Sequence, residues 1–88
     1  MSVILIDFYA DWCGPCVTMK PIIEELEKEL TGKVEVKKIN VDENEEETKR
    51  YGILSIPTYL ILKDDSEVGR IIGVTSKTIL EEKINQNS

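Results

Sequence analysis

The two cysteines of this 88-residue chain stand three positions apart, within the run Trp12-Cys13-Gly14-Pro15-Cys16. They lie where an apolar strand pattern gives way to a helical one, and the first turn of a helix brings residues i and i+3 together. A disulfide between them is therefore within geometric reach. The N–H groups and partial positive charge at a helix N-terminus stabilise a thiolate. The pair suits reversible thiol–disulfide chemistry, and we expect Cys13 to be the exposed nucleophile and Cys16 the protected thiol.

A second candidate for chemistry is Asp7, an acid within the apolar run 3–9. A buried carboxylate is costly unless it is paired or stays neutral. Asp7 is therefore either a strand-end acid that reaches solvent or a buried proton acceptor beneath the dithiol. Lys38 shares a strand face with Val34 and Val36. It is either a lysine that extends to solvent near the strand end or the partner of Asp7 across neighbouring strands.

Composition excludes several other kinds of chemistry. The chain has no histidine, which removes Cys–His catalysis, histidine-ligated zinc and histidine bases. Two cysteines cannot form a four-thiolate metal site within one chain, so we expect no metal and no cofactor. A net charge of −6 argues against nucleic-acid binding. The hydrophobic content of 41% supports one packed domain over residues 1–88.

The sequence also bears on the cellular setting. The N-terminal residues carry no basic region or cleavage-like segment, and the apolar run 3–9 is far shorter than the roughly 20 residues that cross a bilayer. We therefore expect a cytoplasmic protein that does not bind a membrane. We also expect the protein to act as a monomer. In that compartment a Cys-x-x-Cys pair is more often catalytic or metal-binding than structural.

Hydrophobic periodicity predicts the elements that position these residues. Strands are expected at 3–9, 34–41, 58–62 and 67–72, and helices at 14–30, 42–50 and 77–85. Pro21 lies inside the first helix and should kink it. Asp42 or Asn44 is expected to cap the second helix and Ser76 the third. The order β-α-β-α-β-β-α predicts an α/β fold with a mixed four-stranded sheet, strand order 2-1-3-4, flanked by helices.

These residues together resemble the thioredoxin family over nearly the whole chain. The run from Trp12 to Cys16 matches the family's active-site motif in full, and Asp7 and Lys38 match its buried aspartate and that aspartate's lysine partner. Further matches are the helix proline, the segment before the third strand and a later glycine: Pro21, Ile56-Pro57-Thr58 and Gly73. The residues alone favour a trans bond before Pro57, whereas the resemblance implies a cis bond. It also implies the thioredoxin fold for the single domain 1–88.

The resemblance implies a protein-disulfide reductase. Cys13 would attack a substrate disulfide, Cys16 would resolve the mixed disulfide, Asp7 would act as base, and Lys38 would offset the cost of its charge. The implied substrate surface consists of Trp12, Gly14, Pro15, Ile56, Pro57, Gly73 and Val74. Disulfide-containing proteins would be the substrates, and a thioredoxin reductase would return the electrons.

Several features depart from the family pattern. A strand and a helix usually precede the active-site strand, and this sequence does not include them, so the strand at 34–41 is expected to be an exposed edge. Charged residues that would blunt such an edge lie on or beside it: Lys33, Glu35, Lys37 and Lys38. Substitutions relative to common family residues occur at Tyr9, Val17 and Asp64-Asp65. None removes a group that the chemistry needs.

Three alternatives stay open at this point. The short length also suits a glutathione-using, glutaredoxin-like enzyme, although the Gly-Pro between the cysteines counts against it. Cys13 and Cys16 could hold Cu(I), or a cluster shared between two chains, although no Met or His ligand set is evident. The chain could also be an interaction module with incidental redox activity, which would leave Asp7 and Lys38 without a purpose.

Overall fold

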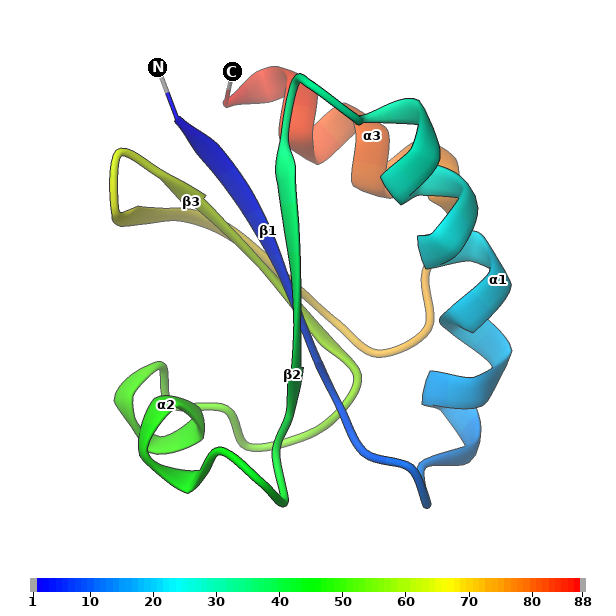
Figure 1. Cartoon of the computed structure of the whole chain (residues 1–88), viewed down its shortest axis with the longest axis vertical. Coiled ribbons are helices and arrows are strands. Elements are labelled where there is room, and N and C mark those ends of the chain that lie inside the picture. The colour runs from blue at the N-terminus through cyan, green and yellow to red at the C-terminus, as the bar shows by residue number, and fades with distance from the viewer. Residues whose placement is uncertain (1, 88) are drawn as a thin grey trace.

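The computed structural model describes residues 2–87 of the chain (Figure 1). The strands are β1 (Val3–Tyr9), β2 (Glu35–Asn40), β3 (Thr58–Lys63) and β4 (Ser66–Ile72). The helices are α1 (Gly14–Glu29), α2 (Glu45–Arg50) and α3 (Lys77–Gln86). This order confirms the predicted succession of elements.

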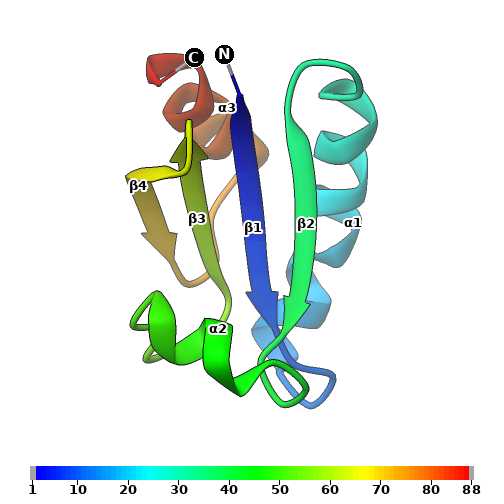
Figure 2. The ribbon, with the colours of Figure 1, turned by 60° about the vertical axis from the view of Figure 1, so that its left-hand side comes forward.

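The four strands form one sheet in the order β2-β1-β3-β4 (Figure 2). β1 runs parallel to β2 and antiparallel to β3, and β3 is antiparallel to β4. The mixed sheet and its strand order agree with the predicted fold class. β1, which precedes the cysteines, lies between two neighbouring strands, so residues on it are held by backbone hydrogen bonds on both sides.

Helices cover both faces of the sheet, with α1 and α3 on one face and α2 on the other (Figures 1 and 2). Side chains of the first face pack with the two long helices in one apolar cluster: Val3, Leu5, Met19, Ile23, Leu26, Tyr59, Ile61, Leu80 and Ile84. The second face forms another cluster beneath α2: Ile6, Phe8, Ile39, Leu60 and Leu62. β1 and β3 contribute to both clusters because they are central strands, which explains their continuous apolar sequence.

Helix α1 starts directly after the active-site strand. Cys13 is its N-cap residue, and a proline occupies the first turn, where a missing N–H leaves no hydrogen bond unmade. The helix continues through Pro21 and ends at Glu29, with Leu30 as C-cap. Gly32 then adopts a positive φ of 83°, a conformation that glycine reaches without the steric cost that a side chain imposes. The N-cap and the proline therefore fix the start of the helix at Cys13.

The turn between β3 and β4 is made by Asp64 and Asp65, with φ values of 50° and 69°. Two positive φ values in a two-residue loop match the twist of a β-hairpin, and aspartate tolerates this region better than most residues. The strands predicted at 58–62 and 67–72 therefore form a hairpin, without the glycine that is usual in its turn.

The expected second helix is shorter than the sequence suggested, because residues 41–43 form a turn and the helix starts only at Glu45. The side-chain Oδ1 of Asn40, which is buried, accepts a hydrogen bond from the Asp42 N–H at 2.9 Å. The side-chain amide of Asn44 donates to the Asn40 carbonyl at 3.0 Å. Asn44 is the N-cap residue of α2, but its side chain makes no capping bond to the helix. Asn40 therefore organises the turn that the periodicity assigned to the helix.

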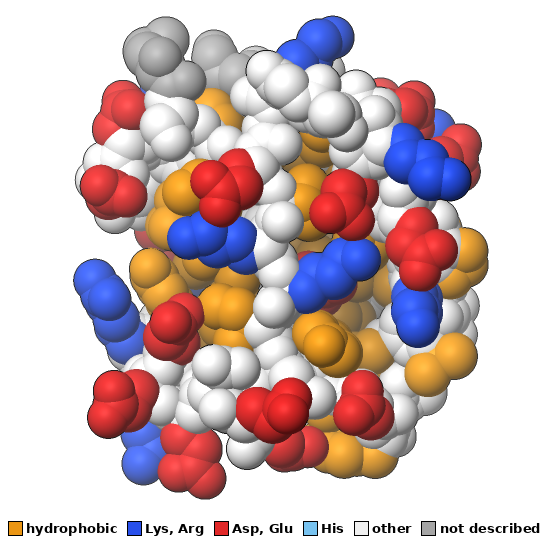
Figure 3. Space-filling view, in the orientation of Figure 1, with side chains coloured by type: hydrophobic (Ala, Val, Ile, Leu, Met, Phe, Trp, Pro, Cys, Tyr) orange, Lys and Arg blue, Asp and Glu red, His pale blue; other side chains and the backbone are white. Residues whose placement is uncertain are grey.

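β2 lies at the edge of the sheet within residues 2–87, as expected. Charged side chains run along it over the centre of the face in Figure 3, with hydrophobic side chains visible in recesses on either side. Lys37 forms an exposed ion pair with Glu35 at 3.7 Å. Charges of this kind disfavour edge-to-edge pairing.

Candidate functional site

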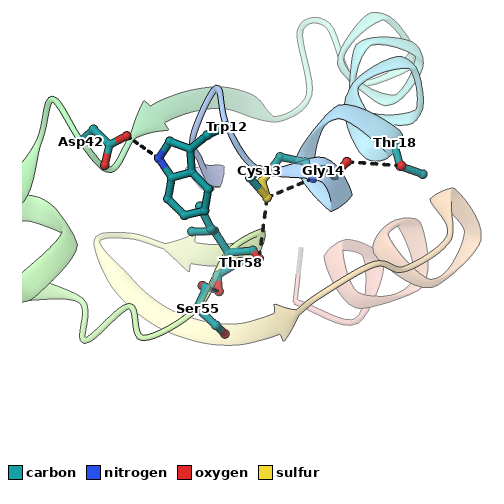
Figure 4. The surroundings of a disulfide bond; sticks show 9 residues. Trp12, Cys13, Gly14, Thr18, Asp42, Ser55 and Thr58 are labelled. Atoms are coloured by element: carbon teal, nitrogen blue, oxygen red, sulfur yellow. Dashed lines mark hydrogen bonds between the residues drawn. A yellow bond between two sulfur atoms is a disulfide. The ribbon is translucent and has the colours of Figure 1, made fainter.

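Cys13 and Cys16 form a disulfide across the first turn of α1, with Cα atoms 5.2 Å apart. The backbone N–H of Cys16 donates a hydrogen bond to Sγ of Cys13 at 3.2 Å (Figure 4). This N–H is one of those that a helix N-terminus leaves without a backbone partner. Sγ of Cys13 thus lies where a negative charge would be stabilised, both by this donor and by the helix dipole.

The expected order of exposure is wrong in this disulfide state. Cys13 is buried, with 4% of its surface exposed, while Cys16 is half-buried. Sγ of Cys13 lies 3.9 Å from the carbonyl oxygen of Ile56, which places the segment before β3 against it. The helix start alone could not reveal this contact, because Ile56 is distant in the sequence. Any preference for Cys13 as nucleophile must therefore come from stabilisation of its thiolate rather than from access.

Exposed apolar side chains surround Cys13 on its outer side. Trp12 is 71% exposed and Val74 is 60% exposed, although large apolar side chains usually avoid water. The indole N–H of Trp12 donates a hydrogen bond to Oδ2 of Asp42 at 2.7 Å (Figure 4). This bond attaches the indole to the turn after β2. We call the surface formed by Trp12, Ile56, Pro57, Gly73 and Val74 the front surface.

Two loops meet at the front surface through the backbone. The Ile56–Pro57 peptide bond is cis, as the resemblance implied and against the preference of the residues alone. Gly73, whose φ is +91°, donates its N–H to the Pro57 carbonyl at 2.8 Å. The hydroxyl of Thr58 donates to the Ser55 carbonyl at 2.7 Å. The Gly73–Pro57 bond fixes the loop after β4 relative to the loop before β3. The Thr58–Ser55 bond fixes the shape of the loop before β3.

Behind Cys16 lies a pocket of about 450 Å³, which we call the rear pocket. Its walls come from β1, the following loop, α1 and β2: Asp7, Tyr9, Ala10, Asp11, Cys16, Val17, Lys20, Ile23 and Lys38. The structure therefore places Asp7, Cys16 and Lys38 around one space. Gly14 and Pro15, at the start of α1, are exposed on the outer side of the molecule.

Asp7 is buried, with 9% of its surface exposed, so the solvent-facing alternative for this residue is wrong. Burial raises its pKa from the ordinary 3.8 to about 6, and the positive charge of Lys38 limits the rise. A carboxyl with a pKa near 6 is mostly ionised at neutral pH and is a better proton acceptor than an ordinary aspartate.

Lys38 pairs in register with Asp7 across β1 and β2, but the expected direct ion pair between them is not formed. Nζ of Lys38 instead lies 3.2 Å from Oε1 of Glu27 on α1, and both side chains are partly exposed. The charge of Lys38 therefore acts on Asp7 from a distance. Glu27 could not be predicted as the partner because it approaches only when α1 packs across the sheet.

Three residues near the site were not expected from the sequence. Asp42 holds the indole of Trp12, and Asn40 organises the turn that carries Asp42. Tyr59 lies opposite Asp7 in the antiparallel β1–β3 pair. For Asn40 and Asp42, the sequence offered only an Asn–x–Asp pattern at the end of a strand as a sign of a turn. Tyr59 looked like an ordinary strand residue.

Within residues 2–87, no cluster of three or more His, Cys, Asp or Glu side chains could bind a metal ion. None of the helices described is both long and apolar enough to span a membrane.

Comparisons with known proteins agree with this geometry. The family model described as Thioredoxin matches residues 1–86. The chain is 46% identical to a thioredoxin of Bacillus subtilis over 86 residues, which cover 98% of this chain and 83% of the relative. It is also 46% identical to a thioredoxin of Rickettsia conorii, covering 96% of this chain and 80% of that protein.

Solved structures show the same likeness. The thioredoxin of Fasciola hepatica superposes with a TM-score of 0.91 at 40% identity, covering 99% of this chain and 82% of the other. The oxidised mitochondrial thioredoxin 3 of Saccharomyces cerevisiae gives a TM-score of 0.88 at 36% identity, covering 97% and 78% of the two chains. With its Cys13–Cys16 disulfide pair, the chain therefore belongs to the thioredoxin family and is a thiol–disulfide oxidoreductase that reduces protein disulfides.

Proposed function

We propose that Cys13 is the attacking sulfur of this protein-disulfide reductase, that Cys16 is the resolving sulfur, and that Asp7 is the base for Cys16. The observation that carries the proposal is the position of Cys13 as N-cap of α1, with Sγ accepting the Cys16 N–H at 3.2 Å. A sulfur in this position gains most from the helix N-terminus when it is ionised. Within residues 2–87 no group donates a hydrogen bond to Sγ of Cys16, which lines the rear pocket with Asp7.

In the first step, the Cys13 thiolate attacks one sulfur of a substrate disulfide. A bond forms between Cys13 Sγ and that sulfur, the substrate S–S bond breaks, and the departing thiolate takes a proton. The product is a mixed disulfide between Cys13 and the substrate. The backbone N–H of Cys16, which already contacts Cys13 Sγ, stabilises the attacking charge.

In the second step, Asp7 accepts the proton of Cys16, directly or through water in the rear pocket. The Cys16 thiolate attacks Cys13 Sγ, the mixed disulfide breaks, and the second substrate thiol is released. Two electrons have then passed from the dithiol to the substrate, which leaves the Cys13–Cys16 disulfide. Asp7 suits this role because burial places its pKa at about 6, and Lys38 keeps it from rising further.

Substrates would dock on the front surface. Trp12 and Val74 offer exposed apolar area, and the backbone at Ile56 lies against the disulfide. An extended substrate segment could pair with this backbone in the manner of an added strand. Gly14 and Pro15 are exposed next to Cys13 and would contact the segment that carries the substrate disulfide.

Membership of the family implies disulfide-containing protein substrates and a thioredoxin reductase as partners. The reductase would return two electrons to the Cys13–Cys16 disulfide and restore the dithiol. We further infer that residues 1–88 act as one domain and as a monomer in the cytoplasm, without binding nucleic acid. Sedimentation of the reduced protein tests the oligomeric state.

The test of this proposal compares Cys16→Ser with Cys13→Ser. Reduced Cys16→Ser, mixed with a disulfide-containing protein, should accumulate a mixed disulfide at Cys13, because no resolving thiol is available. Cys13→Ser is the matched control and should trap almost none, since Cys16 lacks the stabilising N–H. Mass spectrometry of the adducts reads the result. Turnover by Cys16→Ser at the rate of the unchanged protein would refute the two-sulfur order, and so would stronger trapping by Cys13→Ser.

A further inference from the structure

Two buried polar atoms on the α1 side of the sheet have no hydrogen-bond partner within residues 2–87: Oδ1 of Asp7 and the hydroxyl oxygen of Tyr59. Asp7 is 9% exposed and Tyr59 is completely buried. Buried polar groups in folded proteins are almost always hydrogen-bonded, because an unsatisfied group loses its bonds to water without replacement. Two such atoms on adjacent strands need a common explanation.

The register of the sheet places their residues opposite one another. Asp7 on β1 and Tyr59 on β3 are partners in the antiparallel pair. Directly opposite residues of an antiparallel pair project from the same face, with Cβ atoms about 4.5–5.5 Å apart. On this face Tyr59 packs among apolar side chains, including Leu5 and Ile61 from the sheet and Leu80 from α3. These apolar neighbours offer the hydroxyl no partner, while the charge of Asp7, opposite it in the register, acts on it.

The hydroxyl can act only as a donor toward this carboxylate. Burial raises the pKa of Tyr59, and the negative charge of Asp7 raises it further, so the phenol keeps its proton at neutral pH. A protonated phenol donates to a carboxylate in a charge-assisted bond, which is stronger than a bond between neutral groups. The two atoms form no direct bond, but one water between them would satisfy both together.

We propose that the Tyr59 hydroxyl is linked to the Asp7 carboxylate through one bridging water, to which it donates a hydrogen bond, and so favours the charged, proton-accepting form of Asp7. Tyr59 is then a positioning residue: it acts on Asp7 and never meets the reacting sulfurs. The bridging water occupies Oδ1 and leaves the second carboxyl oxygen for the proton of Cys16. The inference deepens the proposed function, because it concerns the base assigned there.

Other charged and titratable groups also face Asp7. Lys38 approaches from β2 and forms an ion pair with Glu27 of α1. Cys16 and Lys20 of α1 line the rear pocket, together with Tyr9 and Asp11 at the end of β1. Lys38 favours the carboxylate by its charge, whereas burial opposes it. The Tyr59 hydroxyl adds a donor from β3, the one side of Asp7 where the neighbours are otherwise apolar.

The test removes only the hydroxyl, with Tyr59→Phe. The pKa of the Asp7 side chain in the reduced protein is measured by 13C NMR, with the resonance assigned by its loss in Asp7→Asn. Loss of one donor to the charged form should raise this pKa by about half a unit to one unit. Tyr51→Phe is the matched control, since Tyr51 packs against the other face of the sheet, and it should leave the Asp7 pKa unchanged.

Stability gives a second, independent measurement. If the hydroxyl is linked to the carboxylate through water, Tyr59→Phe should lower the urea midpoint more at pH 7, where Asp7 is charged, than at pH 4. The difference should vanish in an Asp7→Asn background. A hydroxyl without a partner would instead make Tyr59→Phe neutral or stabilising at both pH values. That result, or an Asp7 pKa that stays the same or falls, overturns the proposal.

Failure of this inference is distinguishable from failure of the proposed function. If Tyr59→Phe raises the NMR-measured pKa of Asp7 and shifts the pH–rate profile of disulfide reduction by the same amount, both stand. If the pKa rises and the profile does not move, the hydrogen bond stands and Asp7 loses its role as base.

Discussion

The two sides of the disulfide differ in almost every physical property. The front surface, around Cys13, exposes the apolar side chains of Trp12 and Val74 above a buried Pro57, and its residues come from three separate loops. The rear pocket, behind Cys16, contains a buried carboxyl on the central strand β1, with charged side chains around it. One side is suited to meet a variable protein surface, and the other is suited to move a proton. Changes at the front should therefore alter substrate binding, while changes at the rear should alter stability and pH dependence.

The largest effect that we expect is on stability at the rear. The folded-state pKa of Asp7 is about 6, above its ordinary value of 3.8, so the native state binds this proton more tightly than the unfolded state. Asp7 therefore contributes most to stability below about pH 4, and this contribution is lost as the pH rises through about 6. Asp7→Asn removes the buried charge and should raise the free energy of unfolding at pH 7 by about 2 kcal/mol. Denaturation at pH 7 and pH 3.5 checks this, because the gain should vanish at the lower pH. An Asp7→Asn protein less stable at pH 7 would show that the carboxylate is well solvated.

At the front, Trp12→Ala should weaken substrate binding. Loss of a large exposed apolar side chain that is fixed by Asp42 should raise KM for protein disulfides by about tenfold, with kcat largely retained. Steady-state reduction of a protein disulfide provides both constants. Val68, an exposed residue near the β3–β4 hairpin, supplies the control Val68→Ala, which should change neither. A fall in kcat with an unchanged KM would place Trp12 in the chemistry and break the division between the two sides.

A smaller effect is expected from Lys38→Met. The positive charge of Lys38 lowers the pKa of Asp7, so its removal should move that pKa, and the pH–rate profile with it, upward by about half a unit. Lys37→Met is the matched control. Lys37 neighbours Lys38 on β2 but pairs with Glu35, and its loss should leave the profile in place. Equal shifts in both variants would mean that general surface charge, and not Lys38, acts on the rear pocket.

The smallest expected effect is a preference in alkylation. With limiting reagent at pH 7, the reduced protein should be labelled several-fold faster at Cys13 than at Cys16, although Cys13 is the less exposed of the two in the disulfide state. The preference should shrink near pH 10, where both thiols are ionised. Peptide mapping after brief labelling gives the ratio. Faster labelling of Cys16 at pH 7 would show that access outweighs thiolate stabilisation.

The order of elements could be predicted from the sequence because each depends on local pattern. Consecutive apolar residues marked β1 as a central strand, and Ser76 marked the start of α3, where its side chain accepts from the Ile79 N–H. The hairpin at Asp64-Asp65 followed from the two flanking strands. Family resemblance supplied the cis bond before Pro57, which local preference alone would have assigned as trans.

What the sequence could not predict depends on contacts between distant segments. The pairing of Lys38 with Glu27 arises when α1 packs on the sheet, and the burial of Cys13 arises when the loop before β3 packs against it. Tyr59 comes to lie opposite Asp7 through the register of β1 and β3. The turn after β2 is a different case: the Asn40 side chain accepts from the Asp42 N–H, the Asn44 side chain donates to the Asn40 carbonyl, and these bonds replace a helical turn. Such side-chain bonds compete locally with helix formation.

The division between front and rear is tested most directly by following the two steps of one turnover separately. Stopped-flow mixing of the reduced protein with a disulfide substrate can resolve formation of the mixed disulfide from its resolution, in the unchanged protein and in Asp7→Asn. At pH 7 we expect Asp7→Asn to form the mixed disulfide at the normal rate and to resolve it at least tenfold more slowly. Equal slowing of both steps, or of neither, would contradict the assignment of attack to Cys13 at the front and proton transfer to Asp7 at the rear.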